Sequence, residues 1–175
     1  RVSRGLGDVY KRQIHRSFTY TGTGDLNYTA FPVQVKTAKD TPLVNVVSAS
    51  ANKDYNVAAD ANGDVYIWGS VNGLSYTYAQ KMAGFEGKNI IAVSAGYTHF
   101  IALSKDGYVY SWGANSYGQV GINTTDNVYV ATLVQKSNGI EPIEDAVKVS
   151  AISNTSLILT RDGQVYAWGQ NVTCL

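Results

Sequence analysis

Val93 to Gly121 read V-S-A-G-Y-T-H-F-I-A-L-S-K-D-G-Y-V-Y-S-W-G-A-N-S-Y-G-Q-V-G. The second half of this stretch occurs three times, as N-G-D-V-Y-I-W-G from Asn62, D-G-Y-V-Y-S-W-G from Asp106 and D-G-Q-V-Y-A-W-G from Asp162. The tryptophans of the three copies are separated by 44 and 56 residues. A period of this size is typical of repeat architectures, in which one supersecondary unit recurs along the chain.

Each copy predicts a β-hairpin. A short apolar run leads into an Asn-Gly or Asp-Gly pair, and a second apolar run follows it. Such a pair between two strand-like runs is the strongest short-range hairpin signal, and it predicts a type I′ turn. The three pairs are Asn62-Gly63, Asp106-Gly107 and Asp162-Gly163.

The strand after each turn alternates with period two, so that both of its faces are apolar. One face carries a tyrosine and a tryptophan, and the other carries smaller side chains, which are aliphatic except for Ser111. A sheet of this kind needs a neighbour on each side, which stacked propeller blades provide. The pattern therefore predicts that Trp68, Trp112 and Trp168 pack in a core, and that a glycine closes each strand where a large side chain would not fit, at Gly69, Gly113 and Gly169.

Another strand precedes each hairpin. Residues 91–95 and 146–151 correspond, and each has a serine 13 residues before the turn glycine. Ser50 keeps the same spacing from Gly63. The first copy departs from the others in its next loop, where Asn52-Lys53-Asp54-Tyr55 replaces the Gly-x-x-His element of Gly96 to His99.

The pattern V-S-A-G-x-x-H-x-x-A-L-x-x-D-G-x-V-x-x-W-G-x-N-x-x-G-Q-V-G resembles the repeat of the regulator of chromosome condensation (RCC1) family. The match is nearly complete over 93–121, good over 149–171 and partial over 49–69. The resemblance implies an all-β fold, a partial β-propeller with antiparallel four-stranded blades, about three of the seven that close a ring in that family. The chain has neither the Trp-Asp pair of WD repeats nor the Gly-Gly pair of kelch repeats.

The chain divides unevenly around these repeats. Residues 1–13 share neither their periodicity nor their composition, and we interpret them as a non-native leader. We expect the repeat region, 14–175, to begin in the last part of one blade and to end within another. The remaining blades of a longer parent chain would then be needed to close the ring. Its expected units are 14–35 as the end of a blade, a repeat over 44–83, a repeat over 90–135 and a truncated repeat over 146–171.

Charge and composition argue against several classes of protein. The leader holds four of the 14 basic residues and one of the 13 acidic ones, so the rest of the chain is slightly acidic and predicts no nucleic-acid partner. A single cysteine, Cys174, excludes an internal disulfide framework, and no apolar run is long enough for a membrane span. The composition favours a secreted or cell-surface protein of a microbe, with a cytoplasmic or nuclear location as the alternative.

The sequence contains no catalytic motif, so we expect no enzyme, no catalytic residue, no cofactor and no metal site. Loop residues are the better candidates for contacts with a partner, because binding residues concentrate on loops that a rigid scaffold holds. His99 has a second reading as an anchor of its loop, and Asn115 and Gln119 can equally bond to the backbone of theirs. The candidate partner-binding residues are Tyr97, His99, Asn115, Tyr117 and Gln119.

These observations favour a non-enzymatic scaffold that recognises a protein partner through its blade loops. The RCC1 resemblance implies an alternative, guanine-nucleotide exchange on a small GTPase, the activity of the founding member of that family. Binding of carbohydrate or cell wall by exposed tyrosines is the other alternative.

Overall fold

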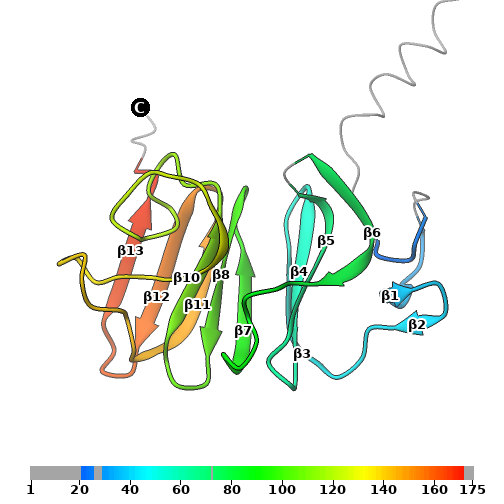
Figure 1. Cartoon of the computed structure of the whole chain (residues 1–175), viewed down its shortest axis with the longest axis horizontal. Helices are drawn as coiled ribbons and strands as arrows, with labels where there is room; N and C mark the ends of the chain where they lie inside the picture. Colours follow the sequence, from blue (N-terminus) through cyan, green and yellow to red (C-terminus); the bar gives the residue numbers. More distant parts are fainter. Residues whose placement is uncertain (1–20, 26–28, 72, 172–175) are drawn as a thin grey trace, which may run out of the picture.

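The computed structural model describes residues 21–25, 29–71 and 73–171, and it is all β over these residues. The leader, 1–13, lies outside them. Three antiparallel sheets stand side by side, and a small two-stranded sheet of β1 (Lys36–Ala38) and β2 (Thr41–Pro42) lies beside the first of them (Figure 1). No helix in the described part of the chain has the length and hydropathy to cross a membrane.

The strands follow one another in chain order within each sheet, and every neighbouring pair is antiparallel. The first two sheets have the expected four strands, and the third has three among the described residues. The first sheet contains β3 (Val46–Ala51), β4 (Tyr55–Asp60), β5 (Val65–Val71) and β6 (Leu74–Lys81). The second contains β7 (Ile90–Ala95), β8 (His99–Ser104), β9 (Val109–Gly113) and β10 (Val128–Leu133). The third contains β11 (Ala146–Ile152), β12 (Thr155–Thr160) and β13 (Val165–Gly169).

The three hairpins are confirmed, but their predicted turn type is wrong. Only the glycine of each Asn-Gly or Asp-Gly pair has positive φ, with 81° at Gly63. Gly63 N donates to Asp60 O at 3.0 Å, and Asp60 N donates to Asp64 O at 3.0 Å. This is a three-residue loop, a type I turn that a glycine bulge closes, and not a two-residue type I′ turn.

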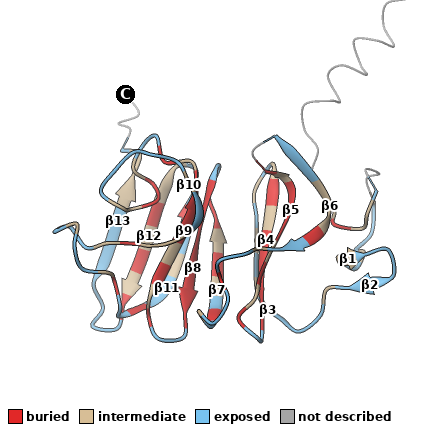
Figure 2. Ribbon diagram, in the orientation of Figure 1, coloured by how far each residue is buried: buried red, intermediate tan, exposed pale blue. Residues whose placement is uncertain are grey.

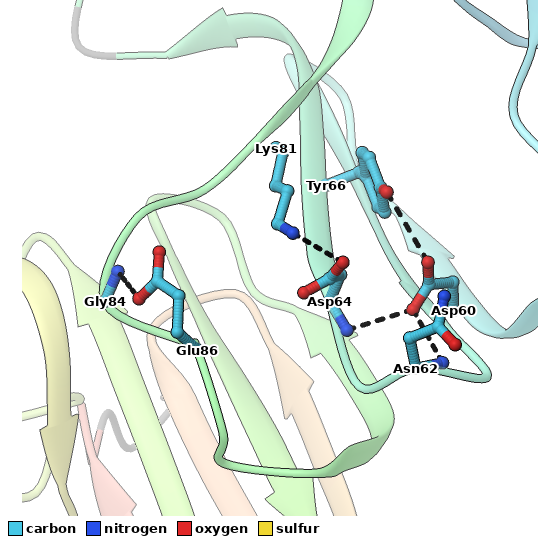
Figure 3. Close-up of polar contacts among 7 residues, drawn as sticks. All are labelled: Asp60, Asn62, Asp64, Tyr66, Lys81, Gly84 and Glu86. Carbon is cyan, nitrogen blue, oxygen red and sulfur yellow. Dashed lines mark hydrogen bonds and ion pairs between the residues drawn. The ribbon is translucent and has the colours of Figure 1, made fainter.

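The residue at the start of each turn explains why the three-residue loop forms instead of the type I′ turn. The Asp60 carboxylate accepts hydrogen bonds from Asn62 N at 2.9 Å and from Asp64 N at 3.0 Å (Figure 3). Ser104 and Thr160 hold the same position in the other hairpins, and each side-chain oxygen accepts the amide four residues further on at 3.0 Å. These side-chain oxygens of buried residues accept backbone amides of the three-residue loop. They therefore stabilise this loop over a two-residue type I′ turn.

The core lies between the sheets, as the two apolar faces of each strand predicted. The small aliphatic face of the first sheet packs against the large-ring face of the second, where the rings of Phe100 and Trp112 have centroids 5.4 Å apart. The same contact recurs between the second and third sheets. Most residues of β4, β5, β8 and β9 are buried (Figure 2). Val65 and Val109 stand at equivalent positions on the aliphatic faces, and both are fully buried.

The segments that contain Gly22 and Val35 contact the first sheet in the way that those containing Gly121 and Val134 contact the third. Gly22 and Val35 cover Trp68, and Gly121 and Val134 cover Trp168. Backbone bonds agree with this equivalence, since Lys36 N donates to Gly22 O at 2.8 Å and Gln135 N donates to Gly121 O at 2.9 Å.

Candidate functional site

The first strands of adjacent sheets, β3, β7 and β11, are joined by serine hydroxyls. Ser50 Oγ accepts a hydrogen bond from Ala95 N at 3.0 Å, and Ser94 Oγ accepts one from Ala151 N at 2.9 Å. Ser48 makes a further bond of this kind with Val93 N at 3.0 Å. Ser50 and Ser94 are two of the serines that stand 13 residues before a turn glycine, so that spacing marks a contact between sheets.

His99 anchors its loop to the next sheet. Its ring is fully buried, and Nε2 lies 2.8 Å from Ser156 Oγ. Ser156 Oγ donates its own hydrogen to Gln119 O at 2.9 Å, so Nε2 must carry the proton and donate to Ser156. Burial lowers the pKa of His99 to about 4, and the ring is therefore neutral near pH 7. The interpretation of His99 as a partner contact is corrected here, because a fully buried ring offers no surface.

The replaced loop of the first repeat makes the equivalent contact with other residues. Asn52 Oδ1 accepts the amides of Asp54 at 2.7 Å and Tyr55 at 2.9 Å, which fixes the loop. Its Nδ2 donates to the carbonyls of Gly96 and Tyr97. The buried Tyr55 hydroxyl donates to His99 O, and burial raises its pKa. Asn52 and Tyr55 therefore tie the first sheet to the second as His99 ties the second to the third.

Asn115 and Gln119 hold the loop of 114–121 from inside. Both side chains are buried. Asn115 donates to Thr124 O and accepts from Val120 N, both at 2.8 Å. Gln119 Oε1 accepts from Tyr117 N at 2.9 Å. The reading in which the two amides bond to loop backbone therefore holds, and neither is available as a partner contact.

Tyr97 and Tyr117 are the candidates that remain on the surface, 46% and 52% exposed. Tyr97 N donates to Ser153 O at 2.6 Å, which places it beside Ile152, itself 67% exposed. Tyr117 belongs to the loop in which Gln119 O accepts hydrogen bonds from Ser156 and from the Trp168 indole. The loops of Tyr97 and Tyr117 thus meet the end of the third sheet where β11 ends at Ile152. We call Tyr97, Tyr117 and Ile152 the rim surface.

The rim surface has little charge. Residues 96–98, 116–118 and 152–154, which surround it, contain no charged side chain, and the adjacent loop of the first sheet, 52–54, contains Lys53 and Asp54. The described residues contain no group of three or more His, Cys, Asp or Glu side chains placed to hold a metal ion. The arrangement suits apolar and hydrogen-bonding contacts with another molecule.

Comparisons with known proteins agree with the repeat assignment. Two family models described as the regulator of chromosome condensation (RCC1) repeat match this chain, one over 90–119 and 146–173 and the other over 106–159. The E3 ubiquitin-protein ligase HERC2 of Homo sapiens is 35% identical over 136 residues, which are 72% of this chain and 3% of HERC2. Mouse HERC2 is 34% identical with the same coverage. The chain therefore spans only a small part of these relatives.

Solved structures share the fold. Human WBSCR16 superposes with a TM-score of 0.66 at 21% identity, over 86% of this chain and 40% of that one. Prp20p of Saccharomyces cerevisiae, whose structure is described with its binding properties to Gsp1p and histones, gives a TM-score of 0.59 at 22% identity, over 72% and 31%. A structure of Kap60 bound to yeast RCC1 (Prp20) gives 0.59 at 20% identity, over 87% and 38%.

Face-to-face antiparallel sheets, joined strand to strand by repeated serines, define this chain as part of a β-propeller repeat protein. Its signature residues recur in register from sheet to sheet. The chain belongs to the RCC1 repeat family.

Proposed function

We propose that this protein is a non-enzymatic scaffold that binds a protein partner through the rim surface of Tyr97, Tyr117 and Ile152. The observation that carries the proposal is that two exposed tyrosines stand on loops that buried side chains fix by hydrogen bonds. His99 fixes the loop of Tyr97, and Asn115 and Gln119 fix that of Tyr117. Loops held in this way lose little conformational entropy when they bind. Tyrosine supplies a large, rigid contact area at a small entropic cost.

The low charge of the rim surface supports one further expectation. A partner held mainly by apolar and neutral hydrogen-bonding contacts should bind with little dependence on ionic strength, because there are few exposed charges to screen. A strongly basic or acidic partner would instead need a rim surface that carries the complementary charge.

Site-specific photo-crosslinking tests the proposal. A photoreactive phenylalanine analogue replaces Tyr97 in one variant, Tyr117 in a second and Ile140 in a control, and the chain is expressed in the organism that encodes it. Ile140 is 82% exposed and lies on a connecting loop outside the rim surface. We expect one and the same protein to be crosslinked at 97 and 117 and not at 140. Equal crosslinking at all three positions, or different proteins at 97 and 117, would contradict a shared binding surface.

Guanine-nucleotide exchange remains the alternative that the family resemblance implies, and carbohydrate binding remains the one that exposed tyrosines imply. Acceleration of nucleotide release from a small GTPase by the full parent chain would favour exchange. Saturable retention on cell-wall polysaccharide that is lost when Tyr97 and Tyr117 are replaced would favour carbohydrate.

A further inference from the structure

Among the described residues, one side chain bonds to both tyrosine loops of the rim surface. Ser156 lies on β12 of the third sheet and is fully buried. Its Oγ accepts a hydrogen bond at 2.8 Å from Nε2 of His99, the residue that begins β8 directly after the loop of Tyr97. The same hydroxyl donates to Gln119 O at 2.9 Å, in the loop of Tyr117. The two tyrosine loops are therefore joined through this hydroxyl group.

His99 depends on Ser156 for the hydrogen bonding of its ring. Its Nδ1 is buried and has no hydrogen-bond partner among the described residues. Without Ser156 Oγ, the hydrogen on Nε2 would also be buried without an acceptor, which is costly. The ring would then leave its present position, and the loop of Tyr97, which ends at His99, would loosen.

The loop of Tyr117 keeps other contacts when Ser156 is lost. Gln119 O also accepts a hydrogen bond from the Trp168 indole at 2.9 Å. The buried amide of Asn115 accepts from Val120 N at 2.8 Å, inside the same loop. Removal of the Ser156 hydroxyl should therefore loosen this loop less than the loop of Tyr97.

The position of Ser156 in its sheet indicates that this link is not a general feature of the repeat. Ser156 pairs with Trp168 in the third sheet, and Phe100 pairs with Trp112 at the equivalent position of the second. Phe100 has no hydroxyl. The repeat before it also has no loop like that of Tyr117, because β6 follows β5 almost directly. The hydroxyl thus occurs where the preceding repeat carries a long loop to which it can bond.

We propose that Ser156 is a positioning residue of the rim surface, which holds the loops of Tyr97 and Tyr117 in one arrangement and transmits a displacement of His99 to the loop of Tyr117. This role rests on the proposed function, since the two tyrosines need a fixed arrangement only if one partner contacts both. A partner bound at Tyr97 then finds Tyr117 in place and loses less entropy on binding. Hydrogen bonds that follow one another in a chain also strengthen one another.

Amide hydrogen exchange of the 175-residue chain, followed at single residues by NMR, tests this proposal. The amides of Tyr97 and Tyr117 are both hydrogen-bonded, at 2.6 Å and 2.9 Å, so each reports on its loop. In Ser156→Ala we expect exchange about tenfold faster at Tyr97 and about threefold faster at Tyr117. Ser156→Thr keeps the hydroxyl and should restore slow exchange at both.

The neighbouring hydroxyl supplies a matched control. Thr155 Oγ1 donates to Gln170 O at 3.0 Å and bonds to neither tyrosine loop, so Thr155→Val should change exchange at neither tyrosine amide. Ala95 reports on the contact between the first and second sheets, and its exchange should stay the same in Ser156→Ala. Exchange is measured without a partner, so its outcome does not depend on whether crosslinking finds one.

A second substitution tests the path from one loop to the other. In Gly96→Ala the added Cβ would lie 2.3 Å from His99 Cε1, so the ring must move. This substitution alone should speed exchange at Tyr117, and in the Ser156→Ala chain it should have no further effect there. Unchanged exchange at Tyr97 in Ser156→Ala, an equal increase at Ala95, or additive effects of the two substitutions at Tyr117 would overturn the proposal.

Discussion

Acidification should weaken this fold through His99. In the folded chain burial lowers the pKa of His99 from 6.5 to about 4. The unfolded chain therefore binds a proton on this residue at a higher pH than the folded chain does. The stability that the neutral ring contributes is complete above about pH 6.5, declines as the pH falls towards 4 and is lost below that. A difference of roughly 2.5 pKa units corresponds to about 3 kcal/mol.

The measurement is urea unfolding at several pH values for the natural chain and for His99→Gln. Glutamine has an amide that can donate to Ser156 in place of Nε2, and it does not titrate. Between pH 7 and pH 4 the natural chain should lose about 3 kcal/mol more than the variant. Carboxylates elsewhere titrate in both proteins and cancel in the comparison. Equal losses in the two proteins would refute the assignment of a buried, neutral His99.

Three further predictions concern packing and function. Val109→Ala should lower the free energy of unfolding by about 2 kcal/mol, because Val109 is fully buried between sheets. Its equivalent Val165 is 64% exposed, so Val165→Ala should change the free energy of unfolding little. Urea unfolding measures both effects. Gly96→Ala should destabilise by about 1–3 kcal/mol in the same assay, since its Cβ would lie 2.3 Å from His99 Cε1, while the exposed Thr98→Ala serves as control. The scaffold proposal predicts no acceleration of nucleotide release from a small GTPase by the full parent chain, and a clear acceleration would contradict it.

Much of the fold could be predicted because its signals are local. The Asn-Gly and Asp-Gly pairs and the alternation around each tryptophan locate the hairpins without any knowledge of distant residues. The Asn-Gly or Asp-Gly pair alone does not determine the turn type, because the same pair also occurs in three-residue loops with a glycine bulge. The capping oxygens of Asp60, Ser104 and Thr160 stand just before the turn in the sequence, and they were the signal that could have corrected it.

The candidate site was harder, because burial depends on distant parts of the chain. Asn115 and Gln119 have the residue types of a recognition loop, and nothing local distinguishes an amide that bonds to its own loop from one that faces a partner. The tie made by Asn52 and Tyr55 was also missed. Their sequence differs from Gly-x-x-His. Only their hydrogen bonds to the carbonyls of Gly96 and His99 show that they, too, join one sheet to the next.

Serine hydroxyls join the stacked sheets, and amide hydrogen exchange at Ala95 and Ala151 measures whether these contacts exist in solution. Each of these amides donates to a serine of the preceding sheet, so its protection depends on the contact between sheets. We predict slow exchange at both amides in the natural chain, and faster exchange at Ala151 alone in the Ser94→Ala variant. Exchange at the rate of an unstructured chain at both amides in the natural protein would contradict the account.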